Sequence, residues 1–114
     1  MICTNPDLVV DRGNKREYCA GSVALVFEHL GGRVIYFGKP HPQVYIQSTN
    51  SKKKKIIAIG DNLRTDIKGA NNMNYDSLFI TQGIHKNEIQ NEGIDNILKK
   101  YDVETTYYQS ELKW

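Results

Sequence analysis

The sequence lacks the features that mark membrane-spanning, secreted and strongly nucleic-acid-binding proteins. No apolar run approaches the roughly 18 residues that a bilayer requires. The opening residues MICTNPDLVV contain neither the basic region nor the long apolar region of a signal peptide. The formal net charge is only +2, which gives no argument for nucleic acid or a membrane as a partner. We therefore expect a cytoplasmic protein that binds neither.

Cysteine and histidine are too few and too scattered to form a ligand set. Cys3 and Cys19 have no metal-binding or redox spacing, and we expect free thiols. His29, His41 and His85 show neither HxH nor HxxxH spacing. The chain also contains no P-loop, no GxGxxG motif and no nucleophile elbow.

What the chain does contain is the composition of one small globular domain with a modest core. Its 114 residues are 39% hydrophobic and 25% charged, an ordinary balance for a soluble domain. The lysine run within residues 51–55 is the single low-complexity patch, and we expect a solvated connector there.

Apolar periodicity and turn formers predict an α/β domain. Residues 4–17 are rich in turn formers. The continuous apolar run 56–60 is typical of a strand covered on both faces. Alternation of strands and helices predicts parallel βαβ units. The expected helices are 18–32, 42–50, 63–73 and 86–101 with a break near Gly93, and the expected strands are 34–37, 56–60, 77–81 and a short one within 104–114.

Polar side chains follow three of these strands. Lys39 follows the first, Asp61 and Asp66 follow the second, and Thr81 ends the third. Because ligands of open α/β sheets bind outside the carboxyl ends of the strands, these residues are candidates for one site. Two carboxylates suit a hard cation such as Mg²⁺.

Each candidate also has a purely structural interpretation. Asp61 or Asn62 could cap the following helix, since both residue types are preferred N-caps. Lys39 lies between Gly38 and Pro40, where it could neutralise a phosphate or simply be an exposed loop lysine. Spacing alone leaves these alternatives open.

The combination of these stretches resembles one enzyme family. Gly38-Lys39-Pro40 upstream of IGDNLRTDI at 59–67 is similar to the C-terminal half of haloacid dehalogenase (HAD) superfamily phosphatases. The nearest subgroup is class IIA, which includes NagD-like nucleotide phosphatases, 4-nitrophenylphosphatases and phosphoglycolate phosphatases. TNPD at 4–7, the helix around 19–21 and TQG at 81–83 are also similar to it, so the resemblance spans nearly the whole chain.

The resemblance implies a role for each matching residue. Asp61 would be a Mg²⁺ ligand, Asp66 would support the metal site, and Lys39 would neutralise charge on the nucleophile and the phosphoryl group. Asn62 would lie close to the substrate. Asn5 and Asp7 would face the substrate from the cap domain.

The resemblance also implies a fold and a domain division. The fold would be a partial three-layer Rossmann-like, HAD-like parallel sheet with helices, together with the tail of a cap domain. Residues 1–33 would be the C-terminal part of the cap, and residues 34–114 would be the C-terminal half of the core.

One departure from the family is large. The family attacks phosphate with an aspartate of a DxD motif, and no two aspartates here have that spacing: 7, 11, 61, 66, 76, 95 and 102. Asp11 follows the apolar run 8–10, but Arg12-Gly13 stands where the second acid should be. We therefore expect a fragment that is inactive alone. In the family, the missing nucleophile strand would lie beside 56–59, whose exposed edge would invite an N-terminal half or self-association.

The resemblance thus implies a Mg²⁺-dependent phosphatase family acting on small phosphorylated metabolites. Two alternatives are a non-catalytic module that binds a phospho-ligand or metal, and a half that needs a separate N-terminal chain. A response-regulator-like domain is disfavoured, because there the lysine follows the phosphoacceptor aspartate, whereas Lys39 precedes Asp61.

Overall fold

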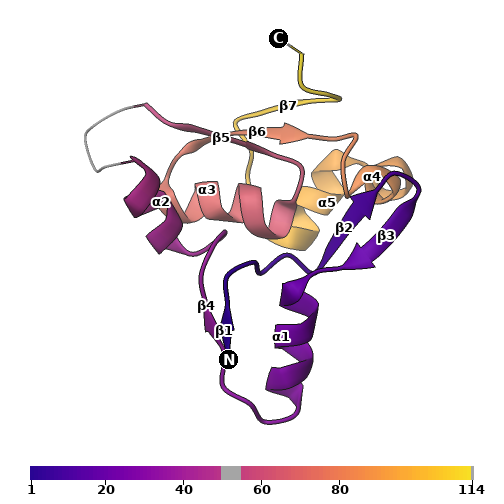
Figure 1. Cartoon of the computed structure of the whole chain (residues 1–114). Helices are drawn as coiled ribbons and strands as arrows, with labels where there is room; N and C mark the ends of the chain where they lie inside the picture. Colours follow the sequence, from indigo (N-terminus) through magenta and orange to yellow (C-terminus); the bar gives the residue numbers. More distant parts are fainter. Residues whose placement is uncertain (50–54, 114) are drawn as a thin grey trace. The chain divides into compact units, whose positions relative to one another are not determined.

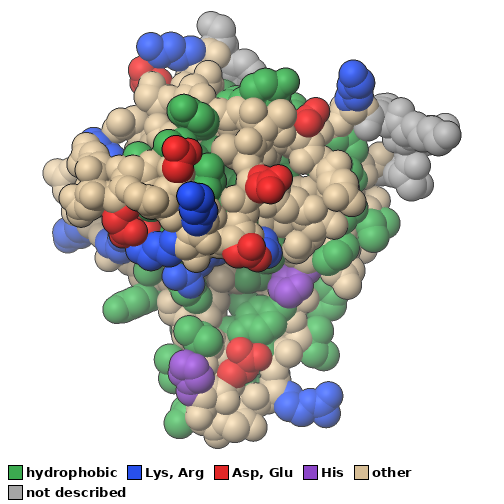
Figure 2. Space-filling model, turned by 180° about the vertical axis from the view of Figure 1, so that it is seen from behind, with side chains coloured by type: hydrophobic (Ala, Val, Ile, Leu, Met, Phe, Trp, Pro, Cys, Tyr) green, Lys and Arg blue, Asp and Glu red, His purple; other side chains and the backbone are tan. Residues whose placement is uncertain are grey.

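The computed structural model describes residues 1–49 and 55–113, which divide into two compact units (Figure 1). The first unit is Met1–Ser51 and the second is Lys52–Trp114. Most of the lysine run that we expected to form a connector lies outside the described residues, and Lys55 is exposed. Figure 2 shows acidic and basic side chains interspersed over one face of the molecule.

The first unit contains two small sheets and two helices. The pair β1–β4 is parallel and the pair β2–β3 is an antiparallel hairpin. The bounds are β1 Ile2–Cys3, β2 Val9–Arg12, β3 Lys15–Tyr18, α1 Ala20–His29, β4 Ile35–Tyr36 and α2 Pro42–Thr49. The strand expected at 34–37 and both expected helices are confirmed.

The hairpin corrects our expectation of a turn-rich segment at 4–17. Arg12 pairs with Lys15 across a two-residue Gly-Asn turn, in which Gly13 has a φ of +60°. Arg16 donates two hydrogen bonds, of 2.8 and 2.9 Å, to the carboxylate of Asp11. The hydrogen bond from the guanidinium lowers the pKa of Asp11. Asp11 is thus engaged in a structural ion pair of the hairpin.

Helix α1 forms where the apolar spacing predicted it, but most of its apolar stripe is exposed. Val23 is 62% exposed and Leu30 is 80% exposed. The buried residues of the helix are Gly21 and Ala24. A Cβ at Gly21 would overlap the backbone of the preceding loop, so the start of the helix packs on that loop through its smallest residue.

The second unit is a three-stranded parallel sheet with helices. The strand order is β5-β6-β7, and both neighbouring pairs are parallel. The bounds are β5 Ile57–Gly60, a π-helical turn Leu63–Ile67, α3 Lys68–Met73, β6 Asp76–Ile80, α4 Lys86–Glu92, α5 Ile94–Tyr101 and β7 Tyr107–Gln109. The α/β class with parallel strands is confirmed, as is the helix break at Gly93.

Helices α3 and α5 lie on the same side of this sheet (Figure 1). The core cluster of the unit contains Leu63, Ile67, Phe79, Ile97 and Val103. On the other face, alternate residues of β5 stay open to solvent, with Ile57 46% and Ile59 45% exposed. Our expectation that this strand is covered on both faces is therefore wrong, because among the described residues of this unit the helices cover one face.

Two further predictions concern the chain as a whole. Within the described ranges, no helix is long and apolar enough to cross a bilayer. The predicted division between 33 and 34 stays a prediction, while the compact units divide between 51 and 52. The pairing of β1 with β4 places residues from both sides of the predicted boundary in one small sheet.

Candidate active site

The acid loop, residues 61–66, follows the carboxyl end of β5. Its second residue is the helix cap: Asn62 has an extended backbone, and its Oδ1 accepts a hydrogen bond of 3.0 Å from the amide of Arg64. Asn62 therefore fills the capping role that the sequence left open between it and Asp61.

The helix predicted at 63–73 begins with a π-helical turn rather than an α-helical one. The amides of Asp66 and Ile67 both donate to the carbonyl oxygen of Asn62, at 2.9 and 3.2 Å. Leu63 and Ile67 are fully buried and fix this turn to the core. Single π-helical turns are rare and occur frequently at functional sites.

Asp66 lies against the end of β5. Its side chain is largely buried, and Oδ2 accepts a hydrogen bond of 3.1 Å from the amide of Asn62. A Cβ at Gly60 would overlap the Asp66 carboxylate, so only glycine leaves room for it there. The Asp66 carboxylate is therefore held against Gly60 and Asn62, the two residues that flank Asp61.

Asp61 is held by the turn that follows β6. The amide of Ile84 donates a hydrogen bond of 3.0 Å to Asp61 Oδ2, and a Cβ at Gly83 would overlap the same carboxylate. Thr81, a candidate for the sheet edge, has an Oγ1 that donates to the carbonyl oxygen of Gln109 at 3.3 Å. Thr81 thus connects β6 to β7, while Gly83 and Ile84 contact the acid.

The remaining predicted site residues lie in the first unit. Lys39 is exposed and follows Gly38, whose φ is +88° and where an added Cβ would overlap the backbone of Thr4. Asn5 Oδ1 accepts a hydrogen bond of 3.2 Å from the amide of Asp7. The GKP turn and the TNPD segment are thus neighbours within this unit, whereas Asp61, Asn62 and Asp66 gather in the other.

A buried histidine that the sequence did not single out contacts the acid loop. His85 is 6% exposed, and its Nε2 accepts a hydrogen bond of 3.2 Å from the amide of Leu63. Its Nδ1 lies 3.5 Å from Oε2 of Glu88. The search for metal-ligand spacing did not reveal His85, because its partner is a backbone amide. The only signal in the sequence is its position directly after the turn at 81–84.

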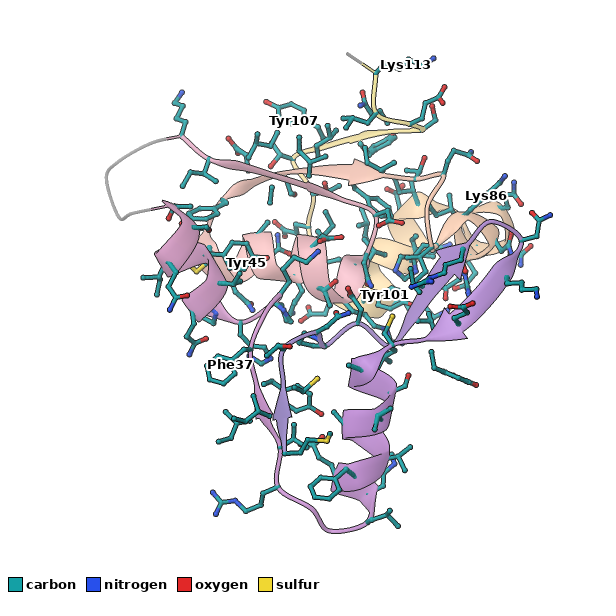
Figure 3. All side chains as sticks on the ribbon, viewed as in Figure 1. Phe37, Tyr45, Lys86, Tyr101, Tyr107 and Lys113 are labelled. Carbon is teal, nitrogen blue, oxygen red and sulfur yellow. The ribbon has the colours of Figure 1, made fainter. Side chains whose placement is uncertain are left out.

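Burial controls the charge state of this histidine. Desolvation lowers the pKa of His85, against an opposing contribution from the Glu88 carboxylate. Burial alone would raise the pKa of Glu88, but that pKa is lowered, with contributions from the hydrogen bond of Tyr101 and the positive charge of Lys100. Tyr101, labelled in Figure 3, donates to both Glu88 oxygens at 3.0 and 2.9 Å. Near neutral pH these two shifts favour a neutral imidazole beside an ionised carboxylate.

The donor set fits a weakly held hard cation. Asp61 and Asp66 supply carboxylate oxygens, which Mg²⁺ prefers, and Mg²⁺ sites often use one or two carboxylates with water and substrate phosphate. Within residues 1–49 and 55–113, no group of three or more His, Cys, Asp or Glu residues gathers in a way that could hold a metal. A cation on this loop would therefore need further ligands from water or phosphate.

Comparison with known proteins identifies the family. The HAD-hydrolase-like family model matches residues 36–106. A cardiolipin synthase (CMP-forming)/mitochondrial hydrolase fusion protein of Schizosaccharomyces pombe is 32% identical over 78 residues, which cover 55% of this chain and 13% of that protein.

Solved structures agree with this assignment. A haloacid dehalogenase-like hydrolase from Brucella suis is 39% identical with a TM-score of 0.68, covering 74% of this chain and 34% of that one. A possible sugar phosphatase of the HAD superfamily from Cytophaga hutchinsonii is 24% identical, with a TM-score of 0.71 and coverage of 94% and 39%. The p-nitrophenyl phosphatase of Archaeoglobus fulgidus is 17% identical, with a TM-score of 0.69 and coverage of 95% and 42%.

The last two structures support the fold, and the chain spans 34% to 42% of the three solved relatives. The family model and the Brucella suis structure together confirm the resemblance to the haloacid dehalogenase superfamily. The chain belongs to the HAD-hydrolase-like family of the haloacid dehalogenase superfamily.

Proposed function

We propose that this chain supplies the metal-binding part of a Mg²⁺-dependent phosphatase site that hydrolyses phosphoric monoesters of small phosphorylated metabolites. The observation that carries the proposal is the anchoring of two carboxylates on one loop at the end of a parallel strand. Asp61 is held by the amide of Ile84, and Asp66 by the amide of Asn62. In a HAD-hydrolase-like chain, this arrangement suits a cation that binds phosphate.

Different residues of the chain have different roles in the proposed reaction. Asp61 and Asp66 hold Mg²⁺, which would polarise a phosphoryl oxygen and neutralise charge as the phosphoryl group is transferred. Lys39 neutralises further negative charge as a point cation. In this proposal Asn62 would contact the phosphate, and Asn5 and Asp7 would contact the substrate. In this proposal residues 1–33 belong to a cap and residues 34–114 to the core.

The attacking group is not among the residues of this sequence. A phosphoaspartate mechanism needs an aspartate nucleophile with a second acid two positions later, and the 114 residues contain no such pair. We therefore propose that the chain is inactive by itself and acts with a polypeptide that carries the DxD motif.

The test uses the Brucella suis relative as the source of that polypeptide, because it is 39% identical over its matched part. Hydrolysis of 4-nitrophenyl phosphate would be measured with Mg²⁺ for this chain alone, for the part of the relative that the chain does not match, and for their mixture. We expect turnover only in the mixture, and loss of at least about a hundredfold with Asp61→Asn, since the metal ligand then loses its charge.

Matched controls separate the possible results. Asp76→Asn changes an exposed aspartate at the other end of β6 and should leave the activity unchanged. Metal-dependent turnover by this chain alone would contradict the proposed need for a separate nucleophile. Turnover in the mixture that is indifferent to Asp61→Asn would contradict the metal-binding role of the acid loop.

A non-catalytic role is a second candidate, because the acid loop is held by contacts within one unit. The hydrogen bonds described above for Asp61 and Asp66 come from residues 62 and 84. The loop could therefore bind Mg²⁺ with a phosphate ligand in the absence of any nucleophile. Calorimetry with Mg²⁺ and inorganic phosphate, added singly and together, tests this role, and binding without any turnover in the mixture would favour it.

A further inference from the structure

The segment Gly83–His85, which we name the clamp, attaches to the acid loop at three consecutive residues. Gly83 packs against the Asp61 carboxylate, Ile84 donates its amide to that carboxylate at 3.0 Å, and His85 accepts the amide of Leu63 at 3.2 Å. The clamp therefore holds both the side chain of the first acid and the backbone two residues further on.

The acceptor role fixes which ring nitrogen carries the proton. Nε2 of His85 can accept a hydrogen bond only when it is unprotonated, so the proton of the neutral ring lies on Nδ1. Nδ1 is directed to Glu88, whose oxygens accept hydrogen bonds of 3.0 and 2.9 Å from the Tyr101 hydroxyl. This tautomer follows from the hydrogen-bond partners.

The surroundings keep the ring in place. Tyr101 contacts His85 edge-on with the ring centroids 4.8 Å apart, and the ring centroid of Phe79 lies 6.4 Å from that of His85. The Arg64 guanidinium, itself part of the acid loop, lies 5.2 Å from the centroid of the Tyr101 ring. The acid loop is thus attached twice to the same cluster, through Leu63 to His85 and through Arg64 to Tyr101.

We propose that His85 is a positioning residue that holds the acid loop in the one conformation that presents Asp61 and Asp66 together. Its Nδ1–H tautomer, set by Glu88 and Tyr101, leaves Nε2 to accept the Leu63 amide. The consequence for metal binding rests on the proposed function, whereas the consequence for the loop itself does not.

Two variants of the full chain separate the acceptor from the ring. His85→Phe keeps an aromatic side chain without an acceptor, whereas His85→Gln keeps an acceptor near the position of Nε2. We expect amide hydrogen exchange at Leu63 to rise at least about tenfold in His85→Phe and to be largely restored in His85→Gln. The amide of Tyr75, which donates to Ala70 in α3 at 2.9 Å, serves as an internal reference and should not change.

A spectroscopic measurement on the unmodified chain keeps the test decisive if His85→Phe does not fold. We expect the imidazole ¹⁵N spectrum near neutral pH to show His85 with the proton on Nδ1. We also expect Tyr101→Phe, which removes the hydroxyl that holds Glu88, to reduce the population of that tautomer. A proton resident on Nε2 would overturn the proposal.

Magnesium titration followed by NMR distinguishes this proposal from the proposed function. Weaker Mg²⁺ binding in His85→Phe, by about tenfold and restored in His85→Gln, supports both. Faster Leu63 exchange in a chain that binds no Mg²⁺ supports the positioning role and contradicts the proposed function. Unchanged Leu63 exchange in a folded His85→Phe variant overturns the positioning role, whatever the metal does.

Discussion

The amide of Ile84 donates a 3.0 Å hydrogen bond to the carboxylate of Asp61, which precedes it by 23 positions in the sequence. This bond joins the turn after β6 to the loop after β5. Neighbouring parallel strands bring their carboxyl ends to one edge of the sheet. The turn after one strand can therefore position a side chain that follows the neighbouring strand. The placement of Asp61 therefore depends on the Gly83–His85 clamp as well as on its own strand.

Replacement of Gly83 by alanine tests this dependence. The added Cβ would overlap the Asp61 carboxylate, so we expect Gly83→Ala to displace the carboxylate, to weaken Mg²⁺ binding and to lower the free energy of unfolding by about 1–3 kcal/mol. Calorimetric titration and urea unfolding measure the two effects.

Gly93→Ala is the matched control for this variant. Gly93 has a φ of +80° and open space around its α-carbon, so alanine there strains the backbone without approaching Asp61. It should lower stability by about 1–3 kcal/mol and leave Mg²⁺ binding unchanged. Equal loss of Mg²⁺ affinity in both variants would show that stability, not the position of Asp61, controls binding.

Two substitutions at Asp66 separate its charge from its hydrogen bond. Asp66→Asn retains an oxygen that can accept from the Asn62 amide, so we expect weaker Mg²⁺ binding with a small change in stability. Asp66→Ala removes the acceptor of a 3.1 Å hydrogen bond in a largely buried place, at a cost of about 1–3 kcal/mol. Urea unfolding of both variants without metal decides this, and equal stability would contradict a structural role for the Oδ2 contact.

The elements that could be predicted are those whose pattern is local. Gly93 correctly predicted the break between α4 and α5, and the apolar run at 56–60 correctly predicted the strand at 57–60. The hairpin was missed because β3, Lys15–Tyr18, has every residue exposed, and a strand without a buried face shows no alternation of apolar and polar residues. The apolar spacing of α1 identified a helix but not what would cover it.

The site was predictable only in part for a related reason. Asp61 and Asp66 could be found because they follow a strand end. The sequence could not show that Asn62 is the cap or that a π-helical turn places Asp66, since both depend on which amide reaches which oxygen. His85 escaped notice because its partner is the Leu63 amide, 22 positions away, and no side-chain spacing encodes such a contact.

The pH dependence of stability offers a test of the buried histidine. Burial lowers the folded-state pKa of His85 below the unfolded value of about 6.5, so the unfolded chain takes up the proton first as the pH falls. We expect its contribution to be complete above about pH 6.5 and to be lost as the pH decreases toward and through the folded-state pKa.

Urea unfolding in a chelator, compared at pH 7 and pH 5, measures this effect. Glu88 and Asp61 raise the pKa of His85 and Arg64 lowers it, and Glu88 stays ionised over this interval because its own pKa is lowered. His85→Phe should flatten the decline in this range. A decline of the same size in the variant would assign the pH dependence to other groups.

The uncovered face of β5 predicts association of the isolated chain. Ile57 and Ile59 are each nearly half exposed on one sheet face, and β5 is the edge strand of the three described in this unit. We expect the chain to bind an apolar dye and to self-associate with rising concentration, and Ile57→Lys to reduce both, because a charge on this face opposes burial. The free energy of unfolding should change by less than about 0.5 kcal/mol, since the position is exposed.

Val10→Lys provides the comparison, since Val10 is 37% exposed but lies in the β2–β3 hairpin of the other unit. Sedimentation velocity and dye fluorescence of the three chains at several concentrations decide the matter. A wild-type chain that stays monomeric and binds no dye would contradict the prediction. An equal effect of Val10→Lys would show that net charge, rather than the β5 face, controls association.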